Sequence, residues 1–159
     1  MDKEVTPANY QELAMRTCLP SAKNWEYCYC LIASEIGEAF GKWGKKFRDG
    51  EFDKEKLTDE LGDVFWGLAL ACELDGHSFE ELWGKRIDYD AIELWIYAPK
   101  KFANFKMIYC YDDLWHIFNF AKAFAEECGI DPLECLKRNI AKLAGRKERG
   151  TLGGNGDDR

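Results

Sequence analysis

The chain has 159 residues, of which 47% are apolar and 14% aromatic, and it carries a formal net charge of −7. A chain of this length and composition is expected to fold around a substantial core, and its acidic charge argues against a nucleic-acid polymer as partner, since phosphate backbones bind basic surfaces. No apolar run approaches the roughly 20 residues that span a membrane, and the first residues do not resemble a signal peptide, so we expect no membrane contact and a cytoplasmic location.

Two helices are predicted in the first third of the chain. Residues 7–17 have the period of a helix, which Pro20 ends because proline lacks an N–H group for the helical ladder. Ser21 is then a candidate N-cap for a long second helix over about residues 21–47. Apolar residues recur along one face of this second helix: Ile32, Ile36, Phe40, Trp43 and Phe47. We expect this face to lie in the core.

A third helix is predicted over about residues 53–75. Asp53 is a candidate N-cap, and Asp75-Gly76 is expected to end the helix because glycine readily adopts the left-handed conformation. Ser78 is a candidate cap for a fourth helix. No alternation of apolar and polar residues typical of strands persists anywhere in the sequence. The expected fold class is therefore all-α.

Glu35 and Glu38 in the second helix, and Glu60 and Asp63 in the third, form two acidic pairs. The members of each pair are three residues apart, so they project from one face of their helix. Because a short turn joins the two helices into an antiparallel hairpin, the pairs can face one another. Converging carboxylates repel one another unless a cation neutralises them, and oxygen ligands without histidine or cysteine suit Mg²⁺ or Mn²⁺. We interpret the four residues as metal ligands; the alternative is a solvated acidic face.

The remaining metal-binding residue types do not form recognisable sites. The seven cysteines make no CxxC pair and no zinc-site spacing, and His77 and His116 make no HxxxH motif. We expect the cysteines to be reduced thiols that fill small spaces in the core. A di-iron carboxylate bundle is disfavoured because it needs two Glu-x-x-His motifs, which the sequence lacks.

Two segments that carry the acidic pairs, LIASEIGEAF and DELGDVFWGLAL, resemble the motifs of the MazG-like all-α nucleoside triphosphate pyrophosphohydrolases. Near the end of the chain a second set of residues is similar to the closing pattern of that family: Asn139, Lys142, Leu143 and Arg146, followed by GTLGGNGDDR. Asn9-Tyr10-Gln11 matches as well. The resemblance implies a four-helix-bundle core with additional helices, a nucleotide substrate, Mg²⁺ as cofactor with Mn²⁺ as a substitute, and a homo-oligomer, expected to be a dimer.

The reaction implied by the resemblance is hydrolysis of a nucleoside triphosphate, expected to be a dNTP, between its α and β phosphates, which gives the monophosphate and pyrophosphate. The four acidic residues would hold the metal, and Glu38, or else Glu35, would accept a proton from the attacking water. The candidate substrate-binding residues are Lys45, Lys142, Arg146, Asn139, Trp43 and Trp66. The basic residues can instead solubilise helix ends, and the tryptophans can belong to the core. The competing interpretation is a catalytically silent helical protein that binds a nucleotide or a protein partner.

We expect residues 1–150 to form a single all-α domain and residues 151–159 a flexible glycine-rich tail. Residues 84–130 look like a degenerate second copy of the acidic hairpin. In this copy Asp90 and Glu93 correspond to the first acidic pair, Asp112-Asp113-Leu114 echoes residues 59–61, and His116 stands in place of Asp63. The all-α dimeric dUTPases contain a similar duplication, which is an analogy at the level of the fold. Coincidence stays an alternative because the identities are sparse.

Overall fold

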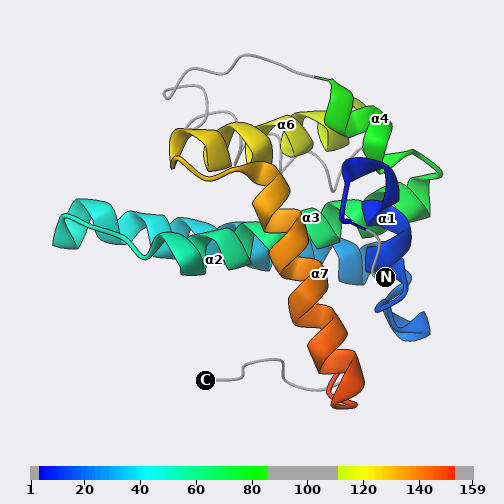
Figure 1. Ribbon diagram of the computed structural model, residues 1–159. Coiled ribbons are helices and arrows are strands. Elements are labelled where there is room, and N and C mark those ends of the chain that lie inside the picture. The colour runs from blue at the N-terminus through cyan, green and yellow to red at the C-terminus, as the bar shows by residue number, and fades with distance from the viewer. Residues whose placement is uncertain (1–3, 86–110, 153–159) are drawn as a thin grey trace.

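The computed structural model describes residues 4–85 and 111–152, and all regular structure in these ranges is helical (Figure 1). Residues 4–85 and 111–152 contain six α-helices and one short 3-10 helix: α1 (Pro7–Met15), η1 (Pro20–Ala22), α2 (Trp25–Asp49), α3 (Lys54–Asp75), α4 (Phe79–Gly84), α6 (Tyr111–Glu127) and α7 (Pro132–Glu148). The all-α prediction is confirmed. None of the helices in the described residues combines the length and the apolar character needed to cross a membrane.

The beginning of α2 and the end of α1 differ from the sequence prediction. Asn24, not Ser21, is the N-cap of α2: its backbone is extended and its Oδ1 accepts a hydrogen bond from the Tyr27 N–H at 2.8 Å. Ser21 lies instead in the 3-10 helix that begins at Pro20. Helix α1 ends at Met15, two residues early, and just beyond it the Thr17 hydroxyl bonds the Ala14 carbonyl at 2.7 Å. Such a local side-chain bond competes with continuation of the helix.

The ends of α3 agree with the prediction. Asp53 is the N-cap, and its Oδ1 accepts a hydrogen bond from the Lys56 N–H at 3.0 Å. Gly76 ends the helix with φ +74°, in the left-handed region that glycine tolerates and other residues avoid. Ser78 caps α4 through a bond from the Glu81 N–H to its hydroxyl. Local capping rules therefore fix the length of the helix that carries Glu60 and Asp63.

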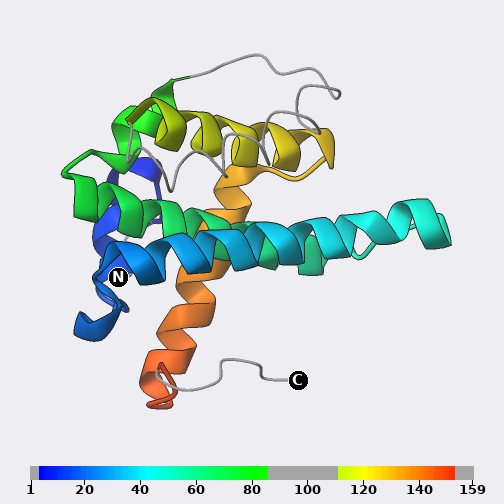
Figure 2. The same ribbon diagram turned by 180° about the vertical axis from the view of Figure 1, so that it is seen from behind.

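Helix α3 is the centre of the molecule and contacts each of the other five α-helices in the described residues. Helices α2 and α3 form the predicted antiparallel hairpin, α6 lies along it, and α7 crosses α3 steeply (Figures 1 and 2). Helices α1 and α4 pack at the end of the hairpin where α2 begins and α3 ends. This arrangement brings α1, α2 and α7 around the acidic part of α3.

Two glycines let neighbouring helices approach α3 closely. A β-carbon at position 62 would lie 2.8 Å from the Cys135 carbonyl oxygen and 3.0 Å from the Asn139 Cβ, both on α7. A β-carbon at position 67 would lie 2.7 Å from the Ile32 Cγ1 on α2. The distances of 2.8 Å and 2.7 Å are shorter than real contacts of a β-carbon allow. The absence of a side chain at Gly62 therefore sets how near α7 comes to Asp63.

Aromatic side chains join α6 to the rest of the core. Phe118 is fully buried, and its ring lies 4.7 Å from that of Phe79 and 6.0 Å from that of Phe65. On α2, Phe40 stacks on Phe124 at 5.3 Å. These contacts close the core over the side of the hairpin away from α7.

The predicted apolar face of α2 is buried only as far as Trp43. Trp43 is 8% exposed, whereas Phe47, one turn further, is 67% exposed, so its predicted place in the core is wrong. The physical reason is that α6 and α7 do not extend along α2 as far as its last turns (Figures 1 and 2). Helical period alone cannot reveal where the covering helix stops.

The predicted second copy is only partly covered by the described residues. Asp90 and Glu93 lie outside them, as does Cys110. Within them, α6 is followed by Gly129 with φ +67°, as α3 is followed by Gly76 with φ +74°. The duplication stays a prediction.

Of the cysteines in the described residues, Cys28, Cys72 and Cys135 are buried as expected, whereas Cys30 is exposed, and all are free thiols.

Candidate metal centre

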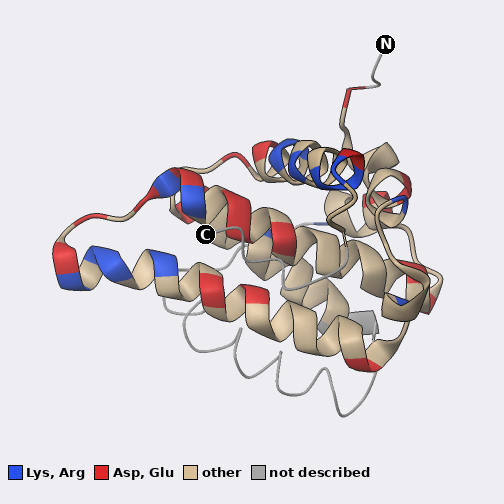
Figure 3. Cartoon of the chain, turned by 90° about the horizontal axis from the view of Figure 1, so that it is seen from below, with Lys and Arg blue, Asp and Glu red and all other residues tan. Residues whose placement is uncertain are grey.

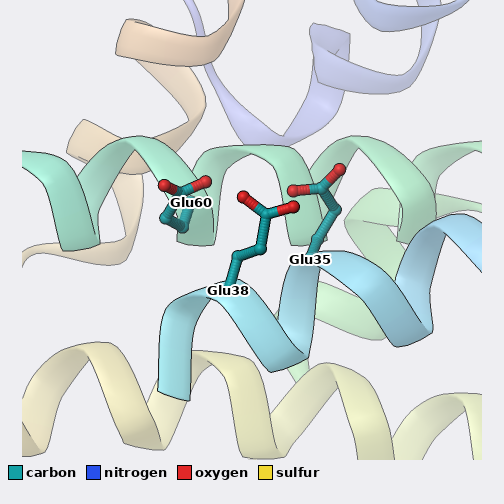
Figure 4. Close-up of side chains that lie close together, drawn as sticks. All are labelled: Glu35, Glu38 and Glu60. Atoms are coloured by element: carbon teal, nitrogen blue, oxygen red, sulfur yellow. The ribbon is translucent and has the colours of Figure 1, made fainter. Parts of the chain in front are cut away.

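The carboxylates of Glu35, Glu38 and Glu60 converge between α2 and α3 (Figure 4). One oxygen from each lies within 4.8 Å of one oxygen from each of the others. Glu35 and Glu38 are one turn apart on α2, and the antiparallel hairpin places Glu60 of α3 opposite them. Glu35 and Glu60 are half-buried and Glu38 is exposed. The structure thus brings together three of the four predicted ligands.

The Glu35 carboxyl lies in an environment that disfavours its negative charge. The pKa of Glu35 is raised to about 8, mainly by burial and then by the charges of Asp63, Glu38 and Glu60 in that order, whereas Lys142 opposes the rise. Loss of hydration and repulsion between like charges both favour the protonated acid. A cation bound among the three carboxylates would reverse this balance, because it favours the ionised form.

Asp63, the fourth predicted ligand, is held by α7 beside this cluster. Its Oδ1 accepts a hydrogen bond from the Asn139 Nδ2 at 2.8 Å, and its Oδ2 pairs with the Lys142 ammonium group. Asn139 is buried, and Lys142 and Asp63 are half-buried. Two residues predicted to contact substrate are therefore placed directly against a predicted metal ligand.

Lys42 lies four residues after Glu38 on α2 and pairs across the hairpin with a member of the cluster. In the structure its Nζ lies 3.1 Å from Glu60 Oε1 across the hairpin. The sequence indicates that Lys42 lies near the acidic pair, because a residue four positions beyond Glu38 lies on the same face of the helix. The Glu38 carboxylate accepts a hydrogen bond from the Ser34 hydroxyl at 3.4 Å.

A second pair between α3 and α7 escaped the sequence analysis. Arg138 donates two hydrogen bonds to the Asp59 carboxylate, at 2.7 and 2.9 Å. This two-point pairing fixes the orientation of the guanidinium plane as well as its position. Asp59 is adjacent to Glu60, so the pair helps to hold α7 in register with the acidic part of α3.

The two candidate tryptophans pack within the protein. Trp43 lies in the core, with its ring edge-on to Phe47 at 5.0 Å and to Phe124 at 5.2 Å. Trp66 is half-buried, and its Nε1 donates to the Ala14 carbonyl and the Thr17 hydroxyl, both at 3.2 Å. Stacking of either ring on a nucleotide base stays a prediction. Their observed contacts hold α6 and α1 in place.

The other basic candidates lie outside the acidic cluster. Lys45 is exposed near the end of α2, where the neighbouring Arg48 pairs with Asp49 through two bonds of 2.7 Å. Arg146 is half-buried near the end of α7. Its carbonyl accepts a hydrogen bond from the Thr151 N–H at 2.9 Å, which turns the beginning of the glycine-rich tail back on the helix. Contact of these residues with a substrate stays a prediction.

The donor set of the cluster fits a hard divalent cation. Its three members offer carboxylate oxygens alone, from two helices of a packed hairpin. Mg²⁺ and Mn²⁺ prefer such ligands, and Mg²⁺ usually binds one or two carboxylates and completes its octahedron with water or phosphate oxygens.

Comparisons with models of protein families, with curated proteins and with solved structures found no match to this chain.

Proposed function

We propose that this protein is a Mg²⁺-dependent nucleotide pyrophosphohydrolase that cleaves a nucleoside triphosphate, expected to be a dNTP, between its α and β phosphates. The observation that carries the proposal is the convergence of Glu35, Glu38 and Glu60 from two helices, with Asp63 held alongside. The resemblance to the MazG-like enzymes supports it, because its motifs contain these same four residues. A homodimer and a cytosolic location belong to the same proposal.

The charges of the site favour a metal–phosphate substrate. A triphosphate would be repelled by the acidic cluster, so a divalent cation has to lie between them. Glu35, Glu38 and Glu60, with Asp63, would hold the cation or cations. When bound, Mg²⁺ would neutralise phosphate charge and lower the pKa of a coordinated water.

The residues of the chain divide the remaining tasks. Glu38 is the exposed member of the cluster, so its carboxylate is accessible to a solvent water and is assigned to accept the proton of the attacking water. Lys42 and Lys142 stand beside the carboxylates and can donate hydrogen bonds to phosphate oxygens. Trp66, one turn beyond Asp63 on α3 and half-buried, is a better candidate for contact with the base than the buried Trp43.

A panel of nucleotides tests the proposal. Purified protein is incubated with each dNTP and NTP in Mg²⁺, and pyrophosphate and inorganic orthophosphate are measured separately, so that hydrolysis between α and β phosphates is distinguished from release of the terminal phosphate. We expect pyrophosphate release from at least one nucleotide and its loss in EDTA. Folded protein that releases no pyrophosphate from any nucleotide would contradict the proposal, and binding without hydrolysis would favour the silent nucleotide-binding alternative.

A further inference from the structure

A chain of hydrogen bonds runs from α1 through α7 to the acidic part of α3. The Tyr10 hydroxyl on α1 donates to the Asn139 Oδ1 at 3.0 Å, and the Asn139 Nδ2 donates to the Asp63 Oδ1 at 2.8 Å. Tyr10 is fully buried and Asn139 is 1% exposed. The hydroxyl of Tyr10 also lies 3.5 Å from the Gly62 carbonyl oxygen. The first and last members of this chain are on different helices and do not share a hydrogen bond.

The order of donors and acceptors along this chain is fixed. An ionised carboxylate accepts hydrogen bonds only, so Asn139 has to turn its NH₂ group toward Asp63. Its amide oxygen then points the other way, into a buried site where it needs a donor. Tyr10 supplies that donor. Burial also raises the pKa of Tyr10 well above its ordinary value, so the hydroxyl keeps its proton.

The contact with Asn139 gives the hydroxyl of the buried Tyr10 ring a role that packing does not. The ring itself packs against Phe79 with centroids 4.8 Å apart, a contact that phenylalanine would also make. What only tyrosine provides is the hydroxyl beside Asn139. Without it the amide oxygen would lose its donor, and the preference for the orientation that bonds Asp63 would weaken.

We infer that Tyr10 is a positioning residue of the metal centre: it fixes the Asn139 amide and, through it, the Asp63 carboxylate. The inference rests on the proposed function, since it concerns the geometry of Asp63, the fourth proposed ligand, which lies beside the cluster. Lys142 holds the other Asp63 oxygen, so the two α7 residues together set the position of this carboxylate, whose charge acts on Glu35. Partners that orient metal ligands in this way commonly change metal affinity when they are removed.

Tyr10→Phe tests the inference, with Mn²⁺ binding to the nucleotide-free protein followed by electron paramagnetic resonance of the free ion. We expect binding about 10-fold weaker than in the parent, the lower end of the range for direct partners of metal ligands because Tyr10 acts through Asn139, with unchanged far-ultraviolet circular dichroism. Thr17→Val is the matched control, because it removes a hydroxyl that ties the end of α1 to Trp66 but takes no part in the Tyr10–Asn139–Asp63 chain. Its Mn²⁺ affinity should equal that of the parent.

A double-mutant cycle separates positioning from general packing. If Tyr10 acts through Asn139, Tyr10→Phe should not weaken Mn²⁺ binding further in an Asn139→Ala background. Additive losses would overturn the inference. A second readout uses no metal: the side-chain amide signals of Asn139 in ¹⁵N NMR should shift in Tyr10→Phe and lose protection from exchange, and unchanged signals would also overturn it.

The outcomes distinguish the two proposals. A parent protein that binds no Mn²⁺ rejects the metal centre, and the inference falls with it. A parent that binds Mn²⁺ and a Tyr10→Phe variant that binds it equally well reject the inference alone. A parent that binds Mn²⁺ but releases no pyrophosphate contradicts the proposed reaction, while the role of Tyr10 in metal binding is still measured by the same titrations.

Discussion

The inner and distal parts of the α2–α3 hairpin, called its two halves below, both carry charged and aromatic residues but have different surroundings. The inner half contains Glu35, Glu38 and Glu60 and is covered by α1, α6 and α7, whereas residues 44–53, which form the distal half, are almost all exposed. Figure 3 shows basic residues gathered near the distal end of α2 and acidic residues further along both helices. Charges in the distal half keep their hydration. Those in the inner half lose part of it and lie close together, which is the condition under which carboxylates recruit a cation.

The largest difference between the halves should appear in activity. Glu35→Gln, Glu38→Gln and Glu60→Gln should each lower pyrophosphate release by about 100-fold or more, the scale of losing one group that stabilises transition-state charge. Glu51→Gln, which removes an exposed carboxylate from the distal half, is the matched control and should keep the parent rate. Near-normal turnover in all three inner variants would place the site elsewhere.

The two halves should also respond oppositely to a methyl group. Gly62→Ala would put a β-carbon against the backbone carbonyl of Cys135, which cannot turn away as a flexible side chain can, so we expect a loss of about 1–3 kcal/mol in the free energy of unfolding. A β-carbon at Gly44, in the distal half, would meet no atom of the described residues within 4 Å. Gly44→Ala should therefore stabilise the protein by roughly 0.5–1 kcal/mol through helix propensity.

Urea denaturation measures both changes. The movement of α7 in Gly62→Ala should also weaken Mn²⁺ binding, because Asn139 and Lys142 would shift with respect to Asp63. Gly67→Ala is an informative intermediate, since its β-carbon would meet the Ile32 side chain, which can adjust. Equal stability of the Gly62 and Gly44 variants would contradict the close packing of the inner half.

The dependence of stability on pH gives a third comparison. In metal-free protein the pKa of Glu35 is about 8, raised from an ordinary value of 4.5, so between these values the folded chain binds more protons than the unfolded chain. The contribution of Glu35 to the free energy of unfolding therefore decreases as pH rises from 4.5 to 8. Chemical denaturation in EDTA across this range should show the decrease in the parent and in Glu51→Gln, but less of it in Glu35→Gln. The same slope in all three proteins would assign it to other groups.

Much of the fold follows from local sequence signals. Helical period and caps predicted the all-α class and the ends of α3, because Asp53 and Gly76 act within their own turns. The same rules misplaced the beginning of α2, where Ser21 and Asn24 are both acceptable caps and only the latter is used. The burial of Phe47 was predicted wrongly for another reason. It depends on the length of the covering helices, which the period of α2 does not encode.

The candidate site also has features that local sequence signals predict and contacts that they do not. The convergence of Glu35, Glu38 and Glu60 follows from the spacing within each helix and a short connection between the two. The contacts of Asp63 do not, because Asn139 is 76 residues away and Lys142 is 79 residues away. The resemblance marked both α7 residues, but as substrate contacts. Their hydrogen bond and ion pair with Asp63 become visible only in the structure, where α7 crosses α3 at Gly62.

The smallest effect should come from the aromatic ring of the distal half. Phe47→Ala removes a ring that is 67% exposed and touches Trp43 edge-on, so little apolar area returns to water and we expect a loss below about 1 kcal/mol in the free energy of unfolding. Phe118→Ala removes a fully buried ring of the same size from the core and should cost about 3–5 kcal/mol. Urea denaturation of the two variants measures the contrast directly. Comparable losses would mean that Phe47 is covered in solution, for example by a second copy of the chain, and this contribution should then depend on protein concentration.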